Sequence, residues 1–291
     1  MTGLADYHVH PGFSIDAEAS SIEDYCRAAL ARGLAEICFT PHYEVDPVRA
    51  ARDWRVRLSD GIFPMDDPAW LDVFFGEITA ARAGFAPLGL TVRAGLEVGF
   101  ERGLEAAVSR VTEAYPFDLV LGAVHCLDHV AISSSRECGD YFGRHAPQEM
   151  ARSYFAALHD AVRSGLFDVM AHLDLYRRHG FRFYGETVDT LYQGLVEPVL
   201  AAMAGRGVGL EVNTSSLAGG GDQFYPSDQV LRLARESGVR VYTLGSDAHR
   251  VADLGRGLES AALRLKGLGL APVSLAGRSP VGGPAAEESG D

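Results

Sequence analysis

Lysine is almost absent from this chain of 291 residues: Lys266 is the only lysine among 26 basic residues. It lies near the C-terminal end, in a predicted final helix, and does not follow a central strand. Schiff-base catalysis needs a lysine amine in the pocket, and some barrel hydrolases bridge two metal ions with a carboxylated lysine after a central strand. The position of Lys266 argues against both kinds of site.

Long apolar runs are missing as well. None reaches the roughly 18 residues of a membrane span, and Asp6 and His8 interrupt the N-terminal segment where a signal peptide would need apolar residues. The 4 cysteines show no CxxC spacing and are predicted to be free thiols. We therefore expect a cytoplasmic protein that does not enter a membrane.

Positive charge is scarce too, and the formal net charge is −13. Nucleic-acid binding depends on Lys and Arg side chains that neutralise phosphates, so the charge argues against nucleic acid as the main partner. A small phosphorylated substrate remains compatible with it, because bound divalent metal ions reverse the local sign of the charge.

Seven apolar segments alternate with helical patterns along the chain. Each segment ends in polar residues, which is typical of the buried strands of a parallel α/β sheet. We expect a seven-stranded (β/α) barrel. The predicted strands are Leu4–Val9, Glu36–Thr40, Thr91–Leu96, Asp118–Val124, Phe167–Ala171, Val208–Val212 and Arg240–Leu244. The predicted helices include one that starts at a capping box, Ser21–Asp24, and four more at Leu104–Tyr115, Gln148–Ser164, Thr187–Gly205 and Ser227–Gly238.

Two stretches depart from this alternation. Glu44–Pro68 is predicted to be a long loop after the second strand, and loops of this length often cover or bind a ligand. Residues 271–291 are rich in Pro, Gly, Ala and Glu and are predicted to be a disordered tail. The barrel domain is therefore expected over residues 1–270.

Histidine and carboxylate side chains follow the predicted strands. His8-Val9-His10 and Asp247-Ala248-His249 each place two donors on one face, because side chains of an extended segment alternate with a period of two. The carboxyl ends of the strands are where α/β barrels build active sites. Imidazole and carboxylate donors without thiolate suit Zn, Mn or Fe. The candidate ligands are His8, His10, His42, Glu97, His125, His172, Asp247 and His249.

Each candidate has a simpler interpretation when taken alone. A histidine after a strand is more often a hydrogen-bonded core or surface residue, and an aspartate before a helix is more often an N-cap. Eight such residues at six strand ends favour a joint metal site. Because Lys266 does not follow a central strand, it cannot bridge two metals. A glutamate remains as the candidate bridge, and Glu97, which directly follows a predicted strand, is in a position to form it. Among the other histidines, His129 and His179 are candidates for supporting or substrate contacts, and His145 and His159 are interpreted as structural.

With these residues in place, the chain resembles the PHP (polymerase and histidinol phosphatase) superfamily. A narrower resemblance to its histidinol-phosphate phosphatase branch rests on Glu211-Val212-Asn213-Thr214-Ser215 and Tyr225-Pro226-Ser227. Together the motifs run from about Asp6 to Leu265. The superfamily motifs are Asp6-Tyr7-His8-Val9-His10, Thr40-Pro41-His42, Gly95-Leu96-Glu97, Gly122-Ala123-Val124-His125, Ala171-His172-Leu173-Asp174-Leu175 and Gly245-Ser246-Asp247-Ala248-His249.

The resemblance implies a distorted (β/α)7 TIM-like barrel with two or three divalent metal ions at the C-terminal ends of the strands. Asp16 enters the ligand set through the resemblance, and it otherwise reads as a loop residue. The resemblance assigns one ion to His8, His10, Glu97 and Asp247, a second to Glu97, His125 and His172, and a third to Asp16, His42 and His249.

A phosphomonoesterase is the activity that the resemblance implies, with a hydroxide that bridges two metals attacking phosphorus. Arg177 is the first candidate for a phosphate clamp and Arg178 the second. Asn213 is a further candidate for substrate contact. The leaving alcohol needs a proton, and Asp247, His249 or a metal-bound water are its candidate donors.

L-Histidinol phosphate, an intermediate of histidine biosynthesis, is the predicted substrate. The branch usually continues its Asn-Thr-Ser motif with Gly-Leu-Arg, whereas this chain has Ser216-Leu217-Ala218 and then three glycines. The missing arginine supports an alternative, a phosphatase for another small phosphate ester, and an arginine from residues 49–57 could replace it. A nuclease or proofreading exonuclease and a non-catalytic metal-binding module are weaker alternatives, which the charge and the complete ligand set respectively argue against.

Overall fold

A parallel sheet forms the centre of the computed structural model, which describes residues 3–220 and 223–281. The strand order is β1-β2-β6-β7-β10-β11-β12, and β3 also pairs with β6. A parallel bridge between Val9 and Ala248 returns the end of β12 to β1. The sheet therefore nearly closes, which confirms the distorted (β/α)7 TIM-like barrel. The strands are β1 (Leu4–Val9), β2 (Leu34–Phe39), β3 (His42–Tyr43), β6 (Thr91–Gly99), β7 (Leu119–Ala123), β10 (Val169–Met170), β11 (Gly209–Asn213) and β12 (Tyr242–Gly245).

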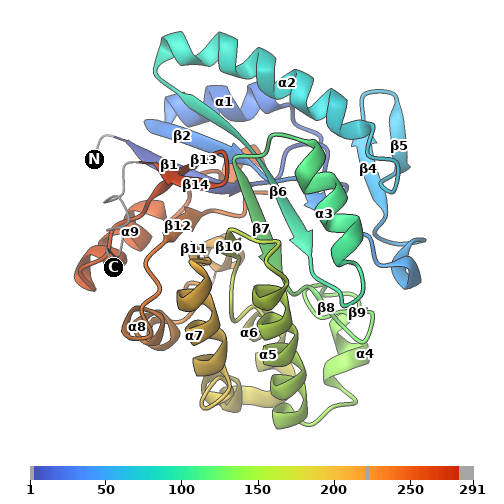
Figure 1. Ribbon diagram of the computed structural model, residues 1–291, viewed down its shortest axis with the longest axis vertical. Coiled ribbons are helices and arrows are strands. Elements are labelled where there is room, and N and C mark those ends of the chain that lie inside the picture. Colours follow the sequence, from blue (N-terminus) through green and yellow to red (C-terminus); the bar gives the residue numbers. More distant parts are fainter. Residues whose placement is uncertain (1–2, 221–222, 282–291) are drawn as a thin grey trace, which may run out of the picture.

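Helices surround the strands on the outside (Figure 1). The first begins at the predicted capping box: the Ser21 hydroxyl accepts from Asp24 N, and the Asp24 carboxylate accepts from Ser21 N. These bonds satisfy backbone donors that the first helical turn leaves free. The helices are α1 (Ile22–Ala31), α2 (Trp70–Phe85), α3 (Glu105–Ala114), α4 (Cys138–Phe142), α5 (Pro147–Ser164), α6 (Arg177–Tyr184), α7 (Val196–Arg206), α8 (Asp228–Glu236) and α9 (Leu258–Gly267).

Apolar side chains cover both faces of the sheet. Every residue of β7 is buried, as expected for a parallel strand covered on both sides. Under α2, Phe74 packs edge-on against Phe13 with ring centroids 5.5 Å apart. Burying one side chain of this size stabilises the fold by roughly 1.5–3 kcal/mol. The barrel therefore gives the polar residues at its carboxyl end a closely packed support.

Two of the longer helices differ from the prediction, and the short helices α4 and α6 are not in the predicted set. The helix predicted at Thr187–Gly205 begins only at Val196, because Gly194 adopts a left-handed φ of 74° that interrupts it. Helix α2 is missing from the predicted set, since its apolar side chains are not confined to one face: Leu71 is buried, whereas Val73 is 46% exposed.

The segment Glu44–Pro68, predicted as one long loop, contains regular structure. Ser59 and Asp60 form a two-residue turn between two short strands, and polar residues of this kind favour turns. Arg57 fastens the hairpin to the loop after β1 by donating to the carbonyl oxygens of residues 12, 14, 15 and 17. The elements are a single-turn helix (Pro47–Arg49), β4 (Arg55–Leu58) and β5 (Gly61–Pro64), and a second small hairpin pairs β8 (Cys126–Leu127) with β9 (Val130–Ala131).

The end of the described chain closes the amino-terminal end of the barrel. The prediction of a disordered tail from residue 271 does not hold for β13 (Ser274–Ala276) and β14 (Ser279–Val281), which form an antiparallel hairpin. Leu275 N donates to Tyr7 Oη at 2.7 Å, and Arg278 Nε lies 3.1 Å from Asp168 Oδ1. These long-range contacts order the hairpin. The rest of the predicted tail, residues 282–291, lies outside the described residues.

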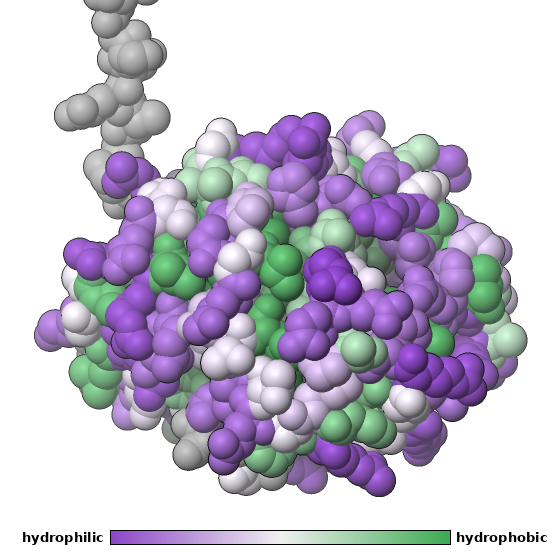
Figure 2. All heavy atoms as spheres, turned by 90° about the horizontal axis from the view of Figure 1, so that it is seen from below, coloured by the Kyte–Doolittle hydropathy of each residue, from purple (hydrophilic) through white to green (hydrophobic). Residues whose placement is uncertain are grey.

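Within residues 3–220 and 223–281, every helix is too short or too polar to cross a membrane. Hydrophilic side chains cover most of the face seen in Figure 2, and hydrophobic ones appear there in small, separate groups. Most of the large apolar side chains are in the core instead.

Candidate metal centre

All nine residues predicted as metal ligands meet at the carboxyl end of the barrel. His8 lies in β1, His42 in β3 and Glu97 in β6. Asp16 comes from the loop after β1, and the other five lie one to four residues after the ends of their strands. Parallel strands end at a common edge, so residues from both ends of the chain become neighbours. The group comprises His8, His10, Asp16, His42, Glu97, His125, His172, Asp247 and His249.

Glu97 lies at the centre of this group and is buried. Its Oε1 is 2.9 Å from His172 Nε2 and 3.3 Å from His125 Nε2, and its Oε2 is 3.4 Å from His10 Nε2. Burial by itself would raise the pKa of Glu97, but the surrounding imidazoles hold it well below its usual range. An ionised carboxylate that faces donors on two sides has the arrangement of a bridging ligand.

His8, His10 and Asp247 form one group of donors beside Glu97. His8 Nε2 is 3.0 Å from His10 Nε2, and His10 Nε2 is 3.2 Å from Asp247 Oδ1. His8 Nε2 lies 3.4 Å from Glu97 Oε1. Ligand atoms that share one zinc ion, each about 2.0–2.2 Å from it, are about 3–3.5 Å apart. The spacing of these four residues therefore fits a single ion.

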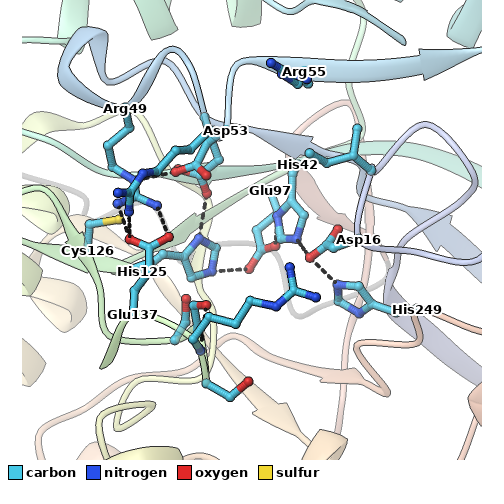
Figure 3. Close-up of a pocket in the computed structure, with 18 of the residues that line it drawn as sticks. Asp16, His42, Arg49, Asp53, Arg55, Glu97, His125, Cys126, Glu137 and His249 are labelled. Atoms are coloured by element: carbon cyan, nitrogen blue, oxygen red, sulfur yellow. Dashed lines mark hydrogen bonds and ion pairs between the residues drawn. The ribbon is translucent and has the colours of Figure 1, made fainter. Parts of the chain in front are cut away.

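Asp16 joins His42 and His249 at the rim of the centre (Figure 3). Its Oδ2 is 3.4 Å from His42 Nε2 and 3.3 Å from His249 Nε2. The Asp16 side chain is 56% exposed, whereas that of Glu97 is 1% exposed. This third group of donors is therefore the one most open to solvent.

Several buried atoms of the centre lack a hydrogen-bond partner within the described residues: Glu97 Oε2, His42 Nδ1 and His172 Nδ1. Glu97 Oε2 and His42 Nδ1 are 2.8 Å apart but are not aligned as a hydrogen bond. Each unsatisfied buried polar group costs about 1–3 kcal/mol, and a cation placed beside Glu97 Oε2 and His42 Nδ1 would satisfy these two atoms. The donor set, which has no thiolate, fits Zn, Mn or Fe.

Two of the nine residues adopt a left-handed backbone, with φ of 27° at His172 and 54° at Asp247. Non-glycine residues rarely adopt this conformation, which costs of order 1–3 kcal/mol. Neighbouring hydrogen bonds hold both turns: His172 N donates to Glu211 Oε2 at 2.9 Å, and Ser246 N donates to Asp6 Oδ1 at 2.9 Å. The turns aim the two side chains at the centre.

The donors open into a cavity of about 740 Å³. Arg49, only 4% exposed, forms part of its wall and pairs with Asp53 and Glu137 (Figure 3). Cys126 also lines the cavity, and burial raises the pKa of its thiol far above the usual range, so it stays neutral. His129 and His179 do not line it: His129 pairs with Asp46, and His179 with a backbone carbonyl.

Arg178, and not Arg177, faces this cavity, which corrects the order of the two candidates. Arg178 Nη2 lies 2.8 Å from Ser215 Oγ and 3.5 Å from Asp247 Oδ2. Arg177 points away and pairs with Asp174 and Asp189, at 3.4 Å and 3.0 Å. The two begin helix α6, where successive residues point about 100° apart.

Asn213 is also placed differently from the expectation of a substrate contact. Its side chain is fully buried, and its Nδ2 donates to Glu211 Oε2 at 3.0 Å and lies 3.5 Å from Asp247 Oδ2. It therefore supports Asp247 from behind.

Sequence reasoning did not assign a role to Glu44 or Glu211, which contact the centre. Glu44 Oε1 is 2.6 Å from His125 Nδ1, and Glu211 Oε1 is 2.6 Å from His8 Nδ1. A signal for Glu44 was present, because it follows His42 by two residues and such positions share a face of an extended segment. Glu211 has the same spacing before Asn213.

Comparison with known proteins agrees with this geometry. The PHP domain model matches residues 6–215. A probable histidinol-phosphatase of Deinococcus radiodurans is 32% identical over 92% of this chain and 95% of that protein. The histidinol-phosphatase of Lactococcus lactis subsp. lactis is 27% identical over 84% of this chain and 83% of that protein. The crystal structure of histidinol phosphate phosphatase from Lactococcus lactis, complexed with zinc, L-histidinol and phosphate, has a TM-score of 0.78 at 23% identity, and the match covers 97% of this chain and 100% of that one. This chain therefore belongs to the PHP domain family.

Proposed function

We propose that the chain is a metal-dependent phosphomonoesterase that hydrolyses L-histidinol phosphate. The observation that carries this proposal is the convergence of eight imidazole and carboxylate residues around the buried Glu97, at the base of a cavity that Arg178 also lines. The relative with 32% identity, named a probable histidinol-phosphatase, supports the choice of substrate. We further propose that it works in the cytoplasm, where its four free thiols would stay reduced.

The nine residues would hold two or three divalent ions, with zinc, manganese and iron as candidates. Such ions polarise phosphoryl oxygens and lower the pKa of bound water, which supplies a nucleophile at neutral pH. Glu97 would hold more than one of these ions, since both of its oxygens face histidine nitrogens. One ion would be held by His8, His10, Glu97 and Asp247, a second by Glu97, His125 and His172, and a third by Asp16, His42 and His249.

Arg178 is the side chain that we propose for binding the phosphate. Its guanidinium is 31% exposed and lines the cavity next to Asp247, and a guanidinium matches two phosphate oxygens at once. Positive charge held there offsets the charge that develops on the phosphoryl group. Asp247 and His249 also line the cavity and remain the protein's candidates for proton transfer to the leaving alkoxide.

Phosphate release from L-histidinol phosphate by the zinc- or manganese-loaded protein tests the proposal. We expect a higher kcat/KM for this substrate than for glycerol phosphate or an aryl phosphate. A His125→Ala variant that stays folded by circular dichroism should lose nearly all activity. The proposal fails if the metal-loaded protein hydrolyses no phosphate monoester.

A phosphatase for another small phosphate ester is the second candidate. It is favoured by Ala218, which stands where the branch usually has an arginine that could contact substrate. The same substrate panel decides between the two candidates, since the second predicts that another ester has the highest kcat/KM.

A further inference from the structure

Two imidazoles of the metal centre are each backed by a glutamate. His8 Nδ1 lies 2.6 Å from Glu211 Oε1, and His125 Nδ1 lies 2.6 Å from Glu44 Oε1. The opposite ring nitrogens of both histidines face the same oxygen, Glu97 Oε1, at 3.4 Å for His8 and 3.3 Å for His125. The two glutamate–histidine pairs therefore flank the central carboxylate in matching geometry.

A glycine leaves room for each of these glutamates. A Cβ atom at Gly99 would overlap the Glu44 carboxylate, and a Cβ atom at Gly245 would overlap the Glu211 carboxylate. The two glycines are the last residues of β6 and β12. The positions of both carboxylates thus depend on backbone sites without a side chain.

Within the described residues, the other imidazoles have no separate glutamate at Nδ1. His10 Nδ1 faces the Ser14 hydroxyl at 3.2 Å, and His172 Nδ1 has no partner. His42 Nδ1 lies 2.8 Å from Glu97 Oε2 and His249 Nδ1 lies 3.0 Å from the Asp247 carbonyl oxygen, so both face residues of the centre itself. A carboxylate that accepts from Nδ1–H fixes the tautomer with the lone pair on Nε2 and makes the ring a stronger donor to a metal. Backing of this kind therefore distinguishes His8 and His125.

We propose that Glu211 and Glu44 are positioning residues, which hold His8 and His125, respectively, with Nε2 directed at Glu97, where the metals would bind. This inference rests on the proposed metal-dependent function. Glu211 also accepts hydrogen bonds from His172 N and Asn213 Nδ2, so it is tied into the buried core. Glu44 lies at the cavity wall with 17% of its side chain exposed. Glu44 is therefore the residue to test first.

Zinc retention measures this role without any substrate. The wild-type protein and the variants Glu44→Gln and Glu137→Gln are loaded with zinc, dialysed against graded chelator, and analysed for zinc per chain by mass spectrometry. Partners of metal-bound histidines typically contribute about 10–100-fold in affinity, so the zinc Kd of Glu44→Gln should rise by about that factor. Glu137→Gln is the matched control, because it removes a carboxylate of the same cavity that pairs with arginines. It should retain zinc like the wild type.

Gly99→Ala supplies an independent variant that keeps Glu44 but displaces its carboxylate from His125. It should lose zinc as Glu44→Gln does. If Glu44→Gln proves unfolded by circular dichroism, the zinc retention of Gly99→Ala tests the positioning role in its place. Wild-type zinc retention in folded Glu44→Gln would overturn the positioning role and leave the proposed phosphatase standing. A wild-type chain that binds no zinc would overturn the metal centre itself, and both proposals with it.

Discussion

At the scale of single residues, two neighbouring arginines have opposite environments. Arg178 reaches the cavity, whereas Arg177 pairs with Asp174, which is 1% exposed. Burial raises the pKa of Asp174 and the Arg177 charge opposes that shift. Arg177 therefore stabilises a buried carboxylate, and Arg178 remains available to a ligand.

Replacing each arginine by alanine should separate these roles. Arg178→Ala should lower kcat/KM by about 100-fold, which is the usual effect of removing one hydrogen-bond donor to the negative charge that develops in the transition state. The Tm should change little. Arg177→Ala should instead lower the free energy of unfolding by roughly 1–3 kcal/mol, because Asp174 loses a partner. Steady-state kinetics and urea unfolding of both variants check this. The reverse pattern would restore Arg177 as the phosphate-binding residue.

The sequence predicts that these side chains converge, because strand ends and the two-residue alternation of side chains fix where His8, His10, Asp247 and His249 point. It does not separate Arg177 from Arg178, since that choice depends on the first turn of α6 and on distant Asp189. The sequence likewise places Asn213 at the end of a strand near the site. It does not predict that the Asn213 side chain is buried and donates to Glu211.

At the scale of elements, an ion pair joins two segments that line the cavity. Arg49, in the segment after β3, pairs with Glu137, which precedes α4. The hydrogen bond from Arg49 lowers the pKa of Glu137. A carboxylate whose pKa is lowered in the folded state stabilises the protein at pH values above its pKa in the unfolded state, which is about 4.3. That contribution is lost as the pH falls through the lowered pKa.

Glu137→Gln should therefore destabilise the protein at about pH 7 and have a smaller effect near pH 3.5. Urea unfolding of the chelator-treated wild type and variant across this range measures the difference in unfolding free energy. A difference that stays constant down to the lowest pH would show that the charge of Glu137 is not what stabilises the contact.

Several elements escape prediction because partners far away in the chain decide them. The strands of the β4–β5 and β13–β14 hairpins are only three or four residues long, and contacts with the loop after β1 and with Tyr7 order them. The barrel strands are predictable, since burial on both faces makes them nearly continuous apolar segments.

At the scale of the whole molecule, the two ends of the barrel are closed in different ways. The carboxyl end holds the charged centre, and the amino-terminal end is covered by the β13–β14 hairpin, in which Leu275 is 1% exposed. Tyr7, within β1, and Asp168, directly before β10, contact this hairpin. The hairpin therefore stabilises the barrel at the end opposite the metal centre.

Leu275→Ala should lower the free energy of unfolding by about 2–5 kcal/mol, the usual cost of truncating a buried leucine. Val281→Ala, in the same hairpin but 50% exposed, should change it little. Chemical denaturation measures both, and kcat of the folded fraction should stay at the wild-type level. An equal effect of the two substitutions would contradict the proposed cover.

Metal removal should weaken the whole fold. Ligands that bind only the native state stabilise it by about 2.7 kcal/mol when their concentration is 100-fold above Kd. Chelator should therefore lower the Tm, and added zinc should restore it. A Glu97→Gln variant should respond much less, because it lacks the ionised carboxylate at the centre. Equal responses to chelator would place the stabilising ions elsewhere.

The left-handed turns at His172 and Asp247 have a consequence for anyone who modifies this protein. A search for stabilising substitutions would select these two positions first, because glycine would relieve their backbone strain. The gain would come at two of the residues that we propose as metal ligands. A more heat-resistant variant obtained in this way would be an inactive one, so selection for stability has to be coupled to an assay of metal content.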